Sequence, residues 1–321
     1  MKAVQAVGAG GPEVLKLVDV AVPEPGPDDV QIAVRFAGVN FADVNARRGT
    51  YLPPDAPPRG LGLDCYGEVT AVGRNVRELR PGQRVAGFAT TAGYAQVVVT
   101  PATLVWPVPD GVRDETAAAF PVVGHTAYHL LATAARLQPG ESVLVTAAAG
   151  GVGTTAVQVA RLLGAGRVVA AAGSAARAAE AGADVSVGYS RLDPGNAGRI
   201  AIALDGVGGA VRRHALDCLG LFGRLVHFGN SCGEPEELPP LRELRERELA
   251  VCGLHLQRLR RERPDLLAHS AQALLGWLAS GRLRIPVAEV LPLEHAAEAH
   301  RKLESRQVKG KLLLAVDGSK P

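Results

Sequence analysis

Residues 142–153 read SVLVTAAAGGVG, an apolar run that leads into three closely spaced glycines. The apolar part predicts a buried strand, and the residues after it predict a helix with one apolar face. That face is formed by Val152, Ala156, Val159 and Leu163. Backbone amides at the start of a helix can hold a diphosphate, and glycines let the phosphate groups come close. The stretch therefore predicts dinucleotide binding, with a purely structural glycine turn as the alternative.

The end of the next predicted strand, Arg167 to Ala172, bears on which nicotinamide cofactor binds. A carboxylate at that place would accept hydrogen bonds from the ribose 2′-hydroxyl of NAD. The chain has none there and instead continues Gly173-Ser174-Ala175-Ala176-Arg177. A guanidinium makes strong, charge-assisted hydrogen bonds to a phosphate, so Ser174 and Arg177 favour the 2′-phosphate of NADPH. The alternative is that Arg177 is an ordinary exposed residue of the following helix.

The pattern of apolar and polar residues changes near Pro121. Before it, short segments such as Val30 to Phe36 alternate apolar and polar residues, which predicts an antiparallel, mainly β region. After it, helical stretches alternate with compact apolar runs, the pattern of βαβ units around a parallel sheet. Those runs are 142–147, 167–172, 200–204 and 223–228. We therefore expect an α/β protein in which a doubly wound Rossmann sheet is inserted into a mainly β domain.

The last part of the chain is expected to return to the first domain. Two helical patterns, 265–280 and 294–304, precede a strand-like run at 311–316. A chain of 321 residues is long for one hydrophobic core, which agrees with two domains. The predicted domains are residues 1–120 together with 256–321, and residues 121–255.

Charge and cysteine content argue against several classes of function. The chain has 35 Lys and Arg against 32 Asp and Glu, a formal charge of +3, which is too weak to predict a nucleic acid or a membrane as the partner. Its four cysteines are far apart and form no CxxC motif, so neither a disulfide framework nor a zinc site is expected, and a reducing cytoplasm fits. No uninterrupted apolar run reaches the roughly 20 residues that span a bilayer.

Ordered motifs run through nearly the whole chain. They include Gly38-Val39-Asn40-Phe41-Ala42-Asp43, Arg48-Gly49-Thr50-Tyr51, Gly67-Glu68-Val69, Pro81-Gly82-Gln83-Arg84-Val85, Thr126-Ala127-Tyr128, the glycine turn and Gly229-Asn230-Ser231. This set resembles the medium-chain dehydrogenase/reductase superfamily, specifically its zinc-independent quinone oxidoreductase, or zeta-crystallin-like, branch. The resemblance implies a GroES-like, mainly β catalytic domain built from both chain ends, which embraces the inserted Rossmann domain with the cofactor in the cleft.

The same resemblance implies roles for individual residues. Asn40 and Tyr51 would line the nicotinamide end of the cofactor as the catalytic groups, and Thr126 would contact the cofactor. The further cofactor contacts would be Gly150, Gly151, Val152, Ser174, Arg177, Tyr189, Phe228, Gly229, Asn230 and Arg306.

A metal site is not expected. Zinc-dependent members of the superfamily need cysteine or histidine ligands, whereas here Asn40 stands in place of the first cysteine and Leu63 in place of a histidine. His295 and Glu298 have a spacing that could ligate a metal, but they are expected on a solvated helix face. His125, beside Thr126, is expected to be a packed histidine, with substrate contact as the alternative.

Hydride transfer without a metal suits an electron-poor acceptor, whose developing negative charge hydrogen-bond donors can meet. The first hypothesis is an NADPH-dependent quinone reductase with Tyr51 and Asn40 as polar groups. The alternative is an enoyl thioester or enone reductase with Tyr51 as proton donor, because Asn45 stands where quinone reductases often have tyrosine. A third hypothesis is an NADPH-binding protein without turnover. The resemblance also suggests a homodimer, through the apolar run near Ala250 to Leu256.

Overall fold

The computed structural model describes residues 1–50, 59–90, 92–235 and 237–316. The chain divides into two compact units. Unit 1 comprises Met1–Val122 and Leu259–Pro321, and unit 2 comprises Val123–Arg258. Unit 1 is therefore built from both ends of the chain, and unit 2 from one continuous stretch.

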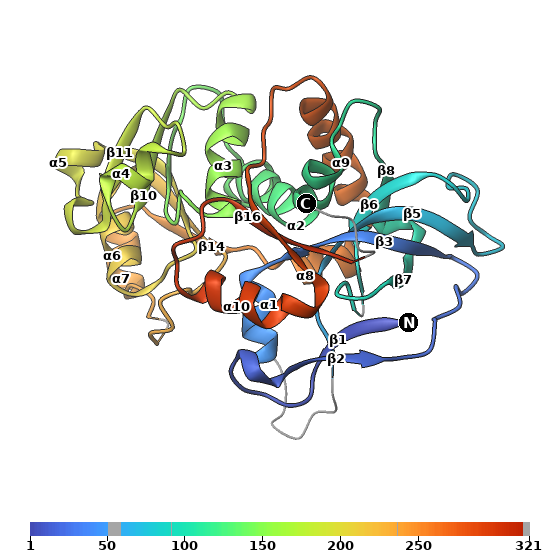
Figure 1. Cartoon of the computed structure of the whole chain (residues 1–321). Coiled ribbons are helices and arrows are strands. Elements are labelled where there is room, and N and C mark those ends of the chain that lie inside the picture. Colours follow the sequence, from blue (N-terminus) through green and yellow to red (C-terminus); the bar gives the residue numbers. More distant parts are fainter. Residues whose placement is uncertain (51–58, 91, 236, 317–321) are drawn as a thin grey trace. The chain divides into compact units, whose positions relative to one another are not determined.

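Unit 1 is mainly β. Its larger sheet has the strand order β15-β16-β3-β5-β6-β8, with β7 also paired to β3, and its smaller sheet has the order β2-β1-β4. The strands are β1 (Lys2–Ala6), β2 (Leu15–Asp19), β3 (Asp29–Val39), β4 (Arg59–Gly60), β5 (Asp64–Val72), β6 (Arg84–Phe88), β7 (Val97–Pro101), β8 (Val105–Pro107), β15 (Val287–Pro292) and β16 (Lys311–Ala315). Figure 1 shows β16, in red, beside β3, in blue, and the two strands are antiparallel. The C-terminal strand thus returns to the N-terminal region, as the sequence predicts.

Strand β3 shows why this region forms a sheet around a core. Val30, Ile32 and Val34 are buried, while the residues between them are half-buried, so one face of the strand is apolar. From Phe36 to Val39 every residue is buried, because both faces of the strand are covered there. Most of the apolar side chains of β3, from Val30 to Val39, belong to one core cluster that also contains residues of β1, β5, β6 and β16.

Unit 2 is a parallel sheet with the strand order β11-β10-β9-β12-β13-β14. Its strands are β9 (Ser142–Val145), β10 (Arg167–Ala172), β11 (Val185–Gly188), β12 (Ile200–Asp205), β13 (Leu219–His227) and β14 (Ala250–Gly253). The chain winds outward in one direction from β9 to β11 and in the other from β12 to β14. The order therefore reverses between β9 and β12, which is where doubly wound sheets bind ligands at the carboxyl ends of their strands.

Helices connect these strands. In unit 2 they are α3 (Gly151–Leu162), α4 (Ala175–Ala179), α5 (Pro194–Ala197), α6 (Gly209–Cys218) and α7 (Leu241–Glu246), with the π-helix η3 (Leu130–Ala135) and the short 3-10 helix η4 (Tyr189–Arg191). In unit 1 they are α1 (Phe41–Arg47), α9 (Pro264–Ala279) and α10 (Ala296–Glu304), with η1 (Pro12–Val14), η2 (Ala102–Leu104) and η5 (Leu293–His295). Two helices, α2 (Asp114–His129) and α8 (Leu256–Glu262), carry the chain from one unit to the other. The predicted fold, a Rossmann sheet inserted into a GroES-like, mainly β domain, is confirmed.

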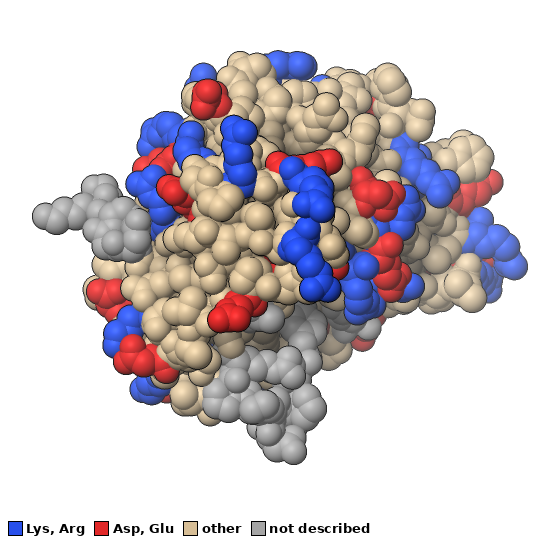
Figure 2. Space-filling model, turned by 90° about the vertical axis from the view of Figure 1, so that its right-hand side faces the viewer, with Lys and Arg blue, Asp and Glu red and all other residues tan. Residues whose placement is uncertain are grey.

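Positive and negative side chains are interspersed on the face drawn in Figure 2, so no charge of a single sign dominates that face. None of the helices in the described part of the chain combines the length and the apolarity that a bilayer crossing requires.

Candidate dinucleotide site

The glycine turn after β9 leaves the amino end of α3 open. Gly150 occupies the N-cap position, and because it has no side chain, no side-chain group caps the first amides of the helix. Ala147 bends the chain with a φ of +50°, a conformation that non-glycine residues rarely adopt. A Cβ atom at Gly153 would lie 2.2 Å from the carbonyl oxygen of Ala147, so only glycine lets α3 approach the turn this closely. The first amides of α3, which have no acceptor within the helix, thus lie at the carboxyl end of β9.

Tyr189, at the carboxyl end of β11, contacts this turn. It follows β11 directly, and its hydroxyl oxygen accepts a hydrogen bond from the amide of Ala147, with an N···O distance of 3.1 Å. The side chain is half-buried. Two positions 42 residues apart in sequence are thus joined beside the open amino end of α3.

Ser174 and Arg177 lie beyond the carboxyl end of β10. Ser174 caps α4, where its hydroxyl accepts a hydrogen bond from the amide of Arg177 at 3.3 Å. A Cβ atom at Gly188 would lie 3.4 Å from the Cα atom of Ser174, so this cap packs next to the residue that precedes Tyr189. The Arg177 side chain is partly exposed. Ser174, one of the two residues predicted to bind a 2′-phosphate, therefore lies beside the residue that precedes Tyr189, and Arg177 follows it in the first turn of α4.

A buried carboxylate that the sequence analysis missed joins the turns on either side of the sheet reversal. Asp205, the last residue of β12, is completely buried. One of its oxygens accepts hydrogen bonds from the Thr146 hydroxyl at 3.2 Å and from the Val207 amide at 3.1 Å. The other accepts from the Nε atom of Arg212 at 2.9 Å. An aspartate at the end of an apolar strand, followed by the glycines of residues 206–209, is the signal that could have revealed it.

Phe228, Gly229 and Asn230 follow β13 at the same edge of the sheet. The amide of Phe228 donates to the carbonyl oxygen of Asp205 at 3.0 Å, and the Phe228 ring lies where a side chain at Gly206 would be, 2.7 Å from its Cβ position. The Asn230 amide nitrogen donates to the carbonyl of Glu234 at 2.7 Å. Asn230 therefore shapes its own loop.

Thr126 and its neighbours lie in α2. Thr126 is only 7% exposed, and His125 and His129 are fully buried and stack with ring centroids 6.3 Å apart. Burial, followed by the neighbouring His129, holds the pKa of His125 well below its usual range, because the interior disfavours a charged imidazole. His125 is thus a packed, neutral histidine.

The other predicted residues lie in unit 1 or outside the described residues. Asn40 is the N-cap of α1 and is 7% exposed. Its amide nitrogen donates to Asp64 at 3.0 Å and to the carbonyl of Gly38 at 3.3 Å, and its amide oxygen accepts from the ammonium of Lys311. Arg306 is exposed, has a φ of +58° and precedes β16. Tyr51 lies outside the described residues.

A second buried polar chain begins at Asn40. The backbone amide of Asn40 donates to Asp43 Oδ2 at 2.8 Å, and the Tyr94 hydroxyl donates to the same oxygen at 3.0 Å. Tyr94 also lies 3.2 Å from His300 Nε2. Burial is the main cause that raises the pKa of Asp43 to about 6, and that lowers the pKa of His300 to about 3.

In the part of the chain that the structure describes, no group of three or more His, Cys, Asp or Glu side chains could hold a metal ion. His295 and Glu298 form an exposed pair, 3.4 Å apart, with side chains 52% and 44% exposed. They lie on the solvated helix surface that the sequence predicts.

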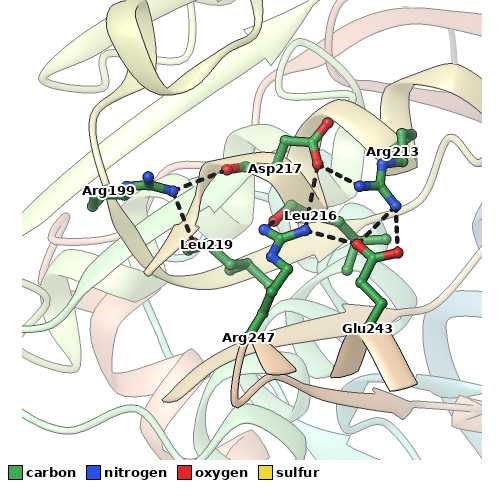
Figure 3. Close-up of polar contacts among 7 residues, drawn as sticks. All are labelled: Arg199, Arg213, Leu216, Asp217, Leu219, Glu243 and Arg247. Atoms are coloured by element: carbon green, nitrogen blue, oxygen red, sulfur yellow. Dashed lines mark hydrogen bonds and ion pairs between the residues drawn. The ribbon is translucent and has the colours of Figure 1, made fainter. Parts of the chain in front are cut away.

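A polar cluster at the opposite edge of the unit 2 sheet has a structural explanation. Figure 3 shows Arg199, Arg213, Leu216, Asp217, Leu219, Glu243 and Arg247 around the end of α6. Arg199 donates to the carbonyls of Asp217 and Leu219, at 3.3 and 3.4 Å, and Arg247 donates to the carbonyl of Leu216 at 2.8 Å. These guanidinium groups cap the carboxyl end of a helix, where cations are favourable. The adjacent cavity of about 500 Å³ lies at the amino ends of the strands, away from the glycine turn.

The structure thus brings nine of the predicted cofactor residues to the carboxyl edge of the unit 2 sheet. They are Gly150, Gly151, Val152, Ser174, Arg177, Tyr189, Phe228, Gly229 and Asn230. Their chemistry suits a dinucleotide, since amides at the start of a helix, a hydroxyl and a guanidinium all favour phosphate groups.

Comparisons with known proteins agree with this architecture. The family model of the alcohol dehydrogenase GroES-like domain matches residues 26–110, and that of a zinc-binding dehydrogenase matches residues 163–314. The quinone oxidoreductase of Pseudomonas aeruginosa is 34% identical, over 98% of this chain and 99% of that protein. Quinone oxidoreductase 1 of Escherichia coli is also 34% identical, over 95% and 96%. The crystal structure of Escherichia coli quinone oxidoreductase complexed with NADPH has a TM-score of 0.89 at 33% identity, covering 98% of this chain and all of that one. As its motifs predict, the chain belongs to the quinone oxidoreductase family of the medium-chain dehydrogenase/reductase superfamily.

Proposed function

We propose that this protein is an NADPH-dependent reductase that transfers a hydride to a quinone. The observation that carries the cofactor assignment is the uncapped amino end of α3, beside the Tyr189 hydroxyl and the Ser174–Arg177 cap. Three features fit a dinucleotide: amides for the diphosphate, glycines that leave space for it, and a cation for a further phosphate. The solved relative named as a complex with NADPH has the same fold at a TM-score of 0.89.

Different residues of the site would bind different parts of the cofactor. The amides after Gly150 would hold the diphosphate, with Gly151 and Val152 covering it. Ser174 and Arg177 would bind the 2′-phosphate, with Tyr189 alongside. Phe228, Gly229 and Asn230 would border the cofactor farther along the same sheet edge, and Thr126 and Arg306 would add contacts. Asn40 would keep the role that the resemblance gives it at the nicotinamide end.

The chemistry follows from the cofactor and from an acceptor that can take two electrons. Bound NADPH supplies a hydride, and a quinone that accepts this hydride and one proton becomes a hydroquinone, while the cofactor becomes NADP⁺. The residues of this chain would bind the two reactants and orient them, which supplies much of the rate in reactions of this kind. The names of the relatives, quinone oxidoreductases of nearly the same length, support the choice of a quinone.

The second candidate is an enoyl thioester or enone reductase. It is supported by Asn45, which stands where many quinone reductases have a tyrosine, and by the nearby Tyr51. In that reaction the carbon that receives the hydride is β to a carbonyl, and Tyr51 would donate the proton to the resulting enolate. Tyr51 would then be a general acid rather than a polar neighbour.

A steady-state assay separates the two candidates. NADPH oxidation is measured with 1,4-benzoquinone, a ring enone and crotonyl thioester, using the wild type and Tyr51→Phe. Quinone reduction by the wild type that survives Tyr51→Phe supports the first candidate. Turnover confined to the thioester, and lost in Tyr51→Phe, would replace it by the second. Tight NADPH binding with no turnover of any acceptor would favour a non-catalytic binding protein.

Two further features stay proposals. We infer a homodimer that uses the edge strand β14 and the residues up to Leu256, because among the described strands β14 has a sheet neighbour, β13, on one side only. We place the protein in the cytoplasm because its four cysteines, all within the described residues, are unpaired.

A further inference from the structure

Lys311 is a buried cation at the start of an otherwise apolar strand. Strand β16 reads KLLLA, and all five residues are buried, with Lys311 only 2% exposed. Its ammonium donates to Asp64 Oδ2 at 2.6 Å and to the amide oxygen of Asn40. The three groups come from three strands or their ends, and Asp64 and Lys311 are 247 residues apart in sequence. We call Asn40, Asp64 and Lys311 the polar triad.

The fold reserves space for the triad. A Cβ atom at Gly38 would lie 2.3 Å from Asp64 Oδ2 and 2.8 Å from the Lys311 Cε atom, so β3 carries glycine where the pair packs against it. The second oxygen of Asp64 is also used, since it accepts the backbone amide of Val122 in α2 at 2.7 Å. Asp64 is thus held on both sides, in a position that a longer side chain at residue 38 would not allow.

Stability alone is a weak reason for such a pair. Two charges pay a large desolvation cost when they are buried, and apolar replacements of similar volume are often as stable or more stable. What the triad does provide is orientation. The two ends of an asparagine amide are nearly identical in shape, but Lys311 can only donate to the oxygen and Asp64 can only accept from the nitrogen. The Asn40 amide therefore has one orientation.

We propose that Lys311 is a positioning residue for the reductase reaction, which acts by holding the Asn40 amide in a single orientation at the nicotinamide end of the cofactor. This inference rests on the proposed function, because it takes from that function the place of Asn40. With both amide hydrogens bound to Asp64 and Gly38, Asn40 presents the remaining lone pair of its oxygen rather than a donor. Loss of Lys311 would leave the amide oxygen without this donor, so that Asp64 and Gly38 would hold the group through its nitrogen alone and its position at the cofactor would be less fixed.

The test must separate orientation from folding. Lys311→Met alone leaves the Asp64 carboxylate buried without its cation, so the main variant is the charge-neutral pair Lys311→Met with Asp64→Asn. We expect this pair to keep its circular dichroism spectrum and its KM for NADPH within threefold, and to lose 10- to 100-fold in kcat. Lys302→Met is the matched control, because Lys302 pairs with Glu289 on the partly exposed surface of α10. It should leave kcat unchanged.

A second comparison asks whether the effect passes through Asn40. The same neutral pair is introduced into an Asn40→Ala background, where there is no amide left to orient. We expect the pair to change kcat less than twofold in that background. Independent, multiplying losses would show that Lys311 does not act through Asn40 and would overturn the proposal. So would a folded neutral pair with the kcat of the wild type. A wild type that reduces none of the acceptors would instead defeat the proposed function itself, and this inference with it.

Discussion

The hydroxyl oxygen of Tyr189 lies 3.1 Å from the amide nitrogen of Ala147, and this hydrogen bond joins the end of β11 to the glycine turn. Ala147 has a φ of +50°, so its turn needs support from its surroundings to hold that conformation. Tyr189 gives that support from a position 42 residues away in sequence. It thereby helps to set the direction of the amides at the start of α3.

Tyr189→Phe should weaken NADPH binding while the fold is kept. The substitution leaves the Ala147 amide without its acceptor, a loss of about 1–2 kcal/mol at a half-buried site, and the turn becomes less fixed. We expect the Kd for NADPH, measured by quenching of protein fluorescence, to rise about tenfold. An unchanged Kd would show that the turn does not depend on Tyr189.

Arg177→Ala should change the choice between cofactors. If Arg177 binds the 2′-phosphate, its loss costs about 1.5–3 kcal/mol with NADPH and little with NADH. The KM for NADPH should rise 10- to 100-fold, and the KM for NADH should stay within threefold. Arg161→Ala is the control, because Arg161 lies near the other end of α3 and pairs with Asp184. Equal effects of Arg177→Ala on both cofactors would contradict the assignment.

Gly153→Ala should damage both stability and cofactor binding. Its Cβ atom would lie 2.2 Å from the backbone oxygen of Ala147, which cannot move without displacing the turn. We expect the free energy of unfolding to fall by about 2 kcal/mol or more, the range found for overpacking. Gly276→Ala in α9 is the matched control, since that position is exposed and open. It should stabilise the protein by up to about 1 kcal/mol, because alanine favours a helix. A Gly153→Ala protein as stable as the wild type would refute the close packing of α3.

His300 should make the protein sensitive to acid. Its pKa is lowered from 6.5 to about 3 in the folded state. Between these two pH values the histidine is therefore protonated in the unfolded chain but not in the native chain. Stability should therefore fall as the pH drops towards about 3, by about 1.4 kcal/mol per pH unit for this one proton. Asp43, whose pKa is raised to about 6 from 3.8, acts in the opposite direction between those two values.

The His300→Gln variant isolates the histidine. Denaturant unfolding is measured at a series of pH values, and the difference in unfolding free energy between wild type and variant is plotted against pH. Because Asp43 is present in both proteins, its contribution largely cancels. The difference should change by about 1.4 kcal/mol per unit between pH 6 and 4. A flat difference would mean that His300 is protonated in the folded protein.

Local signals in the sequence were enough to predict the four central strands of the unit 2 sheet, β10, β9, β12 and β13, whereas β11 was not predicted. The run Arg167–Ala172 is the strand β10 residue for residue, and the glycines after β9 open α3 as expected. The buried face of α3 is less well predicted, since Val152 and Leu163 are only half-buried while Thr154 and Thr155 are buried. Those threonines can be buried because their hydroxyls donate to the carbonyls of Gly150 and Gly151, a compensation that hydrophobic periodicity does not reveal.

Contacts between distant residues could not be predicted in this way. The Asp64–Lys311 pair joins two strands, and the two residues are 247 positions apart in sequence. Neither residue lies in a sequence motif from which its partner could be predicted. Asp205 was missed for a similar reason. Its hydrogen bonds go to Thr146 in one turn and to Val207 in another, and the sequence of its own strand does not show them. The role proposed for Asn40 rests on resemblance, but the contacts that fix its amide became visible only when β3, β5 and β16 were brought together.

The central claim is that unit 2 holds NADPH by its diphosphate and by its 2′-phosphate. Isothermal titration of the wild type with NADPH and with NADH, at one ionic strength, tests it most directly. The claim predicts one site per chain and a Kd for NADPH about 10- to 100-fold lower than that for NADH, as charged hydrogen bonds to one extra phosphate would give. Equal affinity for the two cofactors, or no binding of either, would contradict it.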